Sequence, residues 1–79
     1  MRARLITCSL DYKAESPIWS FKIELLNKDR AAVETLPARS IFFIADKDND
    51  GALYELCRAI RDAKEWHYDA LIGVEFGAD

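Results

Sequence analysis

Three aspartates alternate with other residues in the acidic segment Asp46–Gly51. Asp46, Asp48 and Asp50 stand at positions i, i+2 and i+4, and Gly51 follows the last of them. Carboxylate oxygens at alternate positions of a turn can converge on one hard cation, and a glycine permits the sharp bend that this requires. The segment is therefore the candidate metal site, and calcium is the one cofactor that the sequence suggests.

This segment resembles the first half of an EF-hand calcium loop over its six residues. Leu53 also stands at the apolar eighth position of such a loop. The second half departs from the family, because Cys57 occupies the twelfth position, where the loop needs a bidentate glutamate. The alternative is a turn in which Asp50 caps the following helix. A metal-regulated binding module is therefore the second functional hypothesis.

Residues typical of catalysis are sparse. His67 is the one histidine and lies between Trp66 and Tyr68, at the predicted end of a helix. The sequence has no glycine-rich phosphate loop, no Ser-His-Asp arrangement and no Cys-x-x-Cys spacing. Cys8 and Cys57 fall on apolar stripes, which predicts reduced thiols that react slowly, although a disulfide between them stays open. These features predict a protein that is not an enzyme.

The composition limits the classes of partner. With 79 residues, of which 51% are hydrophobic, the chain is predicted to form a single small domain over residues 1–79. Its 14 acidic and 11 basic residues are intermixed, so no basic stripe for nucleic acid exists beyond the Arg2/Arg4 and Arg58/Arg61 pairs. The pattern also lacks a membrane span and a signal peptide, which predicts a cytoplasmic location.

The first half of the chain alternates apolar and polar residues, as half-buried strands do. One strand is predicted from Arg4 to Lys13 and a second over Trp19–Leu25, paired as an antiparallel hairpin. A polar turn then leads to a third strand, roughly Ala31 to Leu36, with Val33 as its core residue. The residues expected to face the core in the first two strands are Ile6, Cys8, Leu10, Tyr12, Trp19, Phe21, Ile23 and Leu25.

The second half predicts a strand, a helix and a strand. Ser40–Ala45 is apolar throughout, which is typical of a central strand buried on both faces. A helix is expected from Asp50 to about Glu65, with an Arg58–Asp62 ion pair on its outer face. The expected inward residues are Leu53, Leu56, Cys57, Ile60 and Ala63 in the helix, then Ala70, Ile72, Val74 and Phe76 in the last strand. The fold class is α+β: a two-layer sandwich of order β-β-β-β-α-β, with a mostly antiparallel sheet and one helix on one face.

A strand that is apolar on both faces leaves one apolar face away from the helix. The interface candidates are Ile41, Phe42, Phe43, Ile44 and Leu71. A second copy of the chain, forming a homodimer, or another protein would cover this sheet face, unless the Ala14–Pro17 connection or a terminus does so. The sequence thus favours an interaction module, such as an adaptor, an inhibitor or an accessory factor of bacteria or their phages.

Overall fold

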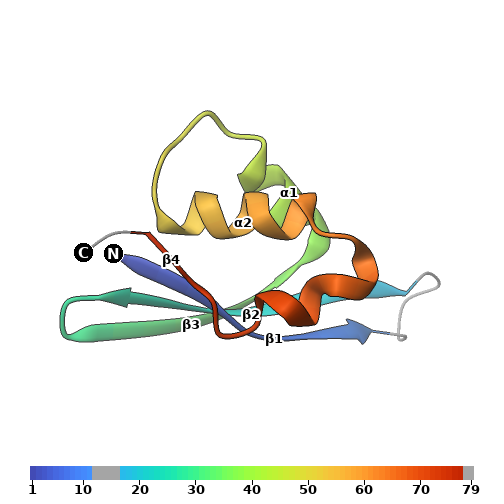
Figure 1. Ribbon diagram of the computed structural model, residues 1–79, viewed down its shortest axis with the longest axis horizontal. Coiled ribbons are helices and arrows are strands. Elements are labelled where there is room, and N and C mark those ends of the chain that lie inside the picture. The colour runs from blue at the N-terminus through green and yellow to red at the C-terminus, as the bar shows by residue number, and fades with distance from the viewer. Residues whose placement is uncertain (12–16, 78–79) are drawn as a thin grey trace.

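Four strands form one antiparallel sheet in the order β3-β2-β1-β4. β1 spans Arg2–Asp11, β2 spans Ile18–Asn27, β3 spans Arg30–Pro37 and β4 spans Glu75–Phe76. In the computed structural model, which describes residues 1–11 and 17–77, the helices all lie over one face of this sheet (Figure 1). The predicted α+β class with a mostly antiparallel sheet is confirmed.

The β1–β2 hairpin is confirmed, but β1 contains a bulge between Leu5 and Thr7. The bulge adds one residue to β1 and so changes the face to which each later residue points. Before it, Ala3 and Leu5 are fully buried; after it, Cys8 faces buried Phe21. The core position in the first part of β1 is therefore Leu5, and the prediction of Ile6 was wrong. The predicted continuation through Tyr12 and Lys13 lies outside the described residues.

The predicted strand Ser40–Ala45 is wrong, because this segment belongs to helix α1, Ala38–Ala45. Pro37 ends β3 and stands at the N-cap of α1. Ile41 and Ala45, four residues apart, are the two buried residues of α1, so the apolar run carries a helical stripe. A short apolar run fits a buried strand and a buried helix equally well by composition. The element order is accordingly β-β-β-α-α followed by a 3-10 helix and β4.

The second helix, α2, spans Ala52–Asp62 and confirms the prediction of a helix there. Leu56, Cys57 and Ile60 are fully buried, as their spacing predicts. Its N-cap is Gly51, at φ 133°, and within the described residues no side chain caps this end. The prediction that Asp50 caps the helix is therefore wrong.

The predicted long final strand is largely replaced by a 3-10 helix, η1, over Glu65–Leu71. Tyr68 anchors η1: it is only 6% exposed and makes edge-to-face ring contacts with Trp19 at 5.2 Å and Phe21 at 5.0 Å. These contacts fix η1 on the sheet where the alternation alone predicts a strand. Two residues of β4 pair with β1, and Ile72 forms an isolated bridge with Leu5. Ile72 and Val74 are exposed instead of buried.

The core lies between the sheet and the two α-helices, and it leaves most of β3 out. α1 packs against β2 and β3, whereas α2 packs against β1 and β4. The turn end of the β2–β3 hairpin extends beyond both helices (Figure 1). Val33, predicted as a core residue, pairs with Glu24 on the open face of the sheet and is 49% exposed, so that prediction was wrong.

Candidate functional site

The most exposed apolar side chains of the helical layer lie on α1. Phe43 is 66% exposed and Phe42 is 38% exposed. Next to Phe43 lies an open groove of about 590 Å³ between the end of β3 and α1, lined by Leu36, Arg39, Ser40, Phe43 and Ile44. We call Phe42, Phe43 and the residues of this groove the α1 patch.

The α1 patch follows from the short helix and its two contacts. α1 packs on α2 and on the sheet, which directs Ile41 and Ala45 inward. Residues one and two positions after Ile41 are rotated by about 100° and 200° around a helix, and so Phe42 and Phe43 turn away from the core. Pro37 lets the chain turn directly from β3 into α1, which places Leu36 beside the helix.

Two basic side chains lie at the α1 patch. The Lys47 ammonium lies 4.5 Å from the centre of the Phe43 ring, a cation–π contact. Arg39 lines the groove from the first turn of α1. The patch therefore combines an apolar surface with a cationic rim.

The predicted interface residues separate in the structure. Ile41 is fully buried, and Ile44 is partly buried at the groove. Leu71 packs against the core from η1, an element that contacts β1 and α2. Only Phe42, Phe43 and Ile44 of the predicted set belong to the α1 patch. The sequence analysis missed Leu36, Arg39 and Ser40; the signal for them was Pro37, which can open a helix as well as end a strand.

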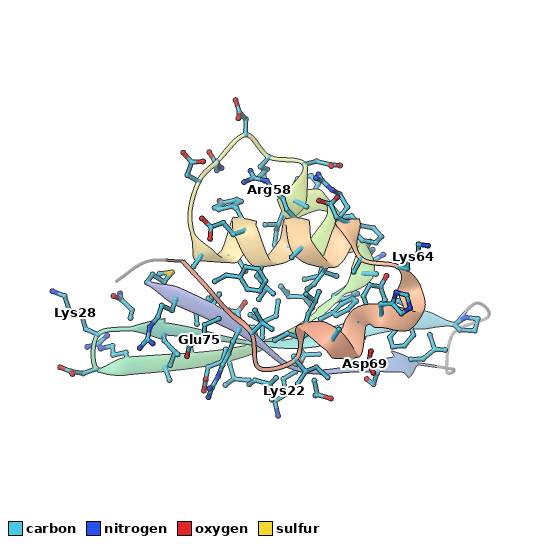
Figure 2. The ribbon with its side chains drawn as sticks, in the orientation of Figure 1. Lys22, Lys28, Arg58, Lys64, Asp69 and Glu75 are labelled. Atoms are coloured by element: carbon cyan, nitrogen blue, oxygen red, sulfur yellow. The ribbon has the colours of Figure 1, made fainter. Side chains whose placement is uncertain are left out.

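The acidic loop between α1 and α2 encloses an arginine. Arg58 rises from α2 into the arc of the loop (Figure 2). Its guanidinium donates to the carbonyl oxygens of Lys47 at 2.7 Å, Asn49 at 2.6 Å and Ala45 at 3.3 Å. These carbonyls include the end of α1, where unpaired acceptors concentrate negative partial charge. Arg58 thus binds the loop, in place of the predicted pairing with Asp62.

The three aspartates do not converge. Asp46 accepts from Arg61 at 3.3 Å, and Asp48 and Asp50 are exposed. Arg61 also donates to Asp62, and this bond, with the contact to Asp46, raises the pKa of Arg61. Among the described residues, no three acidic, histidine or cysteine side chains form a group that could hold a metal. The cation that contacts the backbone of this loop is therefore the guanidinium of Arg58.

Replacing Arg58 by methionine is expected to lower the free energy of unfolding by about 1–2 kcal/mol. The substitution keeps most of the aliphatic stem but removes the donor that three loop carbonyls share. Arg61→Met is the matched control. Arg61 donates to one loop carbonyl, that of Ala45 at 3.4 Å, and its ion pairs with Asp46 and Asp62 are exposed, so its loss should lower stability clearly less than the loss of Arg58. Urea denaturation of both variants measures the difference.

Equal losses in the two variants would contradict the role of Arg58 in the loop. Calcium gives an independent check, because Arg58 occupies the concave side of the loop. We expect millimolar calcium to leave the melting temperature unchanged. A rise in melting temperature that Asp48→Ala abolishes would show that the carboxylates, and not Arg58, organise this segment.

Both cysteines are free thiols. Burial raises the pKa of Cys57 to about 11, although the charge of Arg58 acts in the opposite direction. The thiolate is the reactive form, so maleimide labelling of Cys57 in the folded protein should be slow at neutral pH and accelerate as the pH approaches 11. Burial, and then Asp69, also raises the pKa of Cys8, which is only partly buried. Mass spectrometry of peptides should find Cys8 labelled first; labelling in the reverse order would contradict the packing of α2.

Other polar groups in the described part of the chain lie near the surface. His67 is exposed within η1, and no polar or charged side chain among the described residues is buried. Arg4 and Glu24 pair across β1 and β2 at 2.6 Å. None of the helices described is long and apolar enough to cross a membrane.

Comparison of the chain with protein-family models, with curated proteins and with solved structures finds no significant match. The function proposed below therefore depends on the residues of the chain and their arrangement.

Proposed function

We propose that this chain is a non-enzymatic protein-interaction module that docks through the α1 patch. The observation that carries the proposal is Phe43: it is 66% exposed beside an apolar groove. Aromatic side chains are among the residues that contribute most to protein interfaces, because they bury a large area with few rotatable bonds. A helix face next to an open groove suits a partner that inserts an apolar side chain.

The polar groups of the chain support binding over catalysis. Catalysis needs several polar groups positioned in a pocket that excludes water. The acidic loop is organised by Arg58, and His67 is exposed. An adaptor or inhibitor needs only a stable surface, which a chain of 79 residues can supply. Its free thiols suit a reducing compartment such as the cytoplasm.

Affinity capture from the native host, with the folded protein as bait, tests this function. Phe43→Ser removes the aromatic ring of the α1 patch, and Val74→Ser is the control, because Val74 is 44% exposed next to β4. We expect the same retained protein with wild type and Val74→Ser, and its loss with Phe43→Ser. A partner retained equally by all three baits would contradict docking through the α1 patch.

A further inference from the structure

β3 presents an open edge of the sheet. It is eight residues long, whereas β4 at the opposite edge has two. Residues 30–35 are all exposed. Exposed edge strands pair with additional strands unless prolines, charges or bulges prevent it. The one proline of β3 is Pro37, its last residue, and the sequence at its centre is Ala31-Ala32-Val33.

The hairpin determines which backbone groups of β3 face outward. Asn27 pairs with Arg30 across a two-residue turn. In an antiparallel pair, residues alternate between bonding the partner strand and pointing away from it. Counting from Arg30, the outward backbone groups belong to Ala31, Val33 and Thr35. A strand added antiparallel to this edge would bond these residues.

The charges on β3 complement those of a second β3. Arg30 and Glu34 are four residues apart, so their side chains share one face of the strand. Neither forms an ion pair with another described residue. If two copies of β3 pair antiparallel about Ala32, Arg30 of each copy lies opposite Glu34 of the other. The two Ala32 residues form a pair without backbone hydrogen bonds, in which the Cα atoms approach to about 4.5 Å. The small alanine side chain suits that spacing.

The helical layer fits the same arrangement. α1 packs over β2 and β3, so the α1 patch lies beside the β3 edge. If a two-fold axis perpendicular to the sheet relates the two copies, their sheets form one continuous sheet. Both α1 helices then lie on the same face of that sheet. We propose that the occupant of this edge is a second copy of the chain, added antiparallel to β3 with two Arg30–Glu34 pairs. In this register Leu36 of one copy lies opposite Lys28 of the other, so each α1 patch lies towards the β2–β3 turn of its partner. This proposal rests on the interaction function above.

Light scattering and analytical ultracentrifugation of charge variants test the pairing. The wild type is expected to approach twice its monomer mass of 9.0 kDa as its concentration rises. Arg30→Glu and Glu34→Arg each place like charges opposite one another twice, and should raise the dimer dissociation constant by about tenfold or more. Mixed together, the two variants should form a heterodimer, since each then meets the opposite charge. The double variant R30E/E34R should dimerise like the wild type.

Both residues are exposed, so these substitutions should leave the fold intact; circular dichroism checks this. A wild type that stays monomeric at millimolar concentration would overturn the pairing. Failure of the mixture and of the double variant to dimerise would also overturn the β3 pairing. The outcomes that overturn this pairing can be distinguished from those that overturn the interaction function. A monomer that still captures a partner through Phe43 overturns the β3 pairing alone, whereas capture independent of Phe43 contradicts docking through the α1 patch.

Discussion

Replacing Ile41 by glutamate should unfold the protein, whereas Phe43→Glu should leave it folded. Ile41 is fully buried between α1 and the sheet, and Phe43 is 66% exposed. A carboxylate at position 41 would have no partner in the apolar core, at a cost of several kcal/mol. The whole stability of a chain of this length is only about 4–12 kcal/mol. Circular dichroism and thermal denaturation of the two variants measure the outcome.

The pair of variants also separates a helix from a strand. Residues two apart on a strand point to the same face, so in the predicted strand Ile41 and Phe43 would both be buried or both be exposed. On a helix they lie about 200° apart. Unfolding of both variants, or folding of both, would therefore contradict α1.

The strands and helices that bury one face and expose the other are predictable from the sequence. Phe21 and Ile23 lie on the core face of β2 as the alternation predicts, and Leu56 and Ile60 lie on the stripe of α2. In each case the period of the apolar residues matches the geometry of one element, with polar residues on the opposite face. Such segments predict both the type of element and its orientation.

The segment that forms α1 has no such contrast. Phe42 and Phe43 are apolar yet exposed, so the residues that would mark the polar face of a helix are absent. The exposed phenylalanines concealed the helical stripe of Ile41 and Ala45. The feature that misled the sequence analysis is therefore the same one that makes α1 the candidate binding surface.

The remaining differences come from contacts between residues distant in the chain. The bulge in β1 changes the face of its second half without a proline or glycine to indicate it. Tyr68 fixes η1 through rings on β2, about 50 residues earlier in the chain. Arg58 binds loop carbonyls 9 to 13 residues away. Local periodicity carries no information on any of these pairings, which explains why the final strand and the loop were predicted incorrectly.

Leu56→Ala and Ile72→Ala remove equal numbers of carbon atoms from positions that the sequence assigns equally to the core. Leu56 is fully buried, and its truncation should lower the free energy of unfolding by about 2–5 kcal/mol through lost burial and a residual cavity. Ile72 is 41% exposed, and its backbone contact with Leu5 survives truncation. The loss there should be about 1 kcal/mol or less.

Urea denaturation at one fixed protein concentration measures both variants, so that self-association affects them equally. A shift of the midpoint at constant slope reports the change in stability alone. If Ile72→Ala costs as much as Leu56→Ala, the chain after η1 is buried as a full strand would be, and β4 is longer than two residues. If Leu56→Ala costs little, α2 does not pack on the sheet. The difference between the two variants therefore measures where the core ends, between the buried face of α2 and the exposed segment that leads to β4.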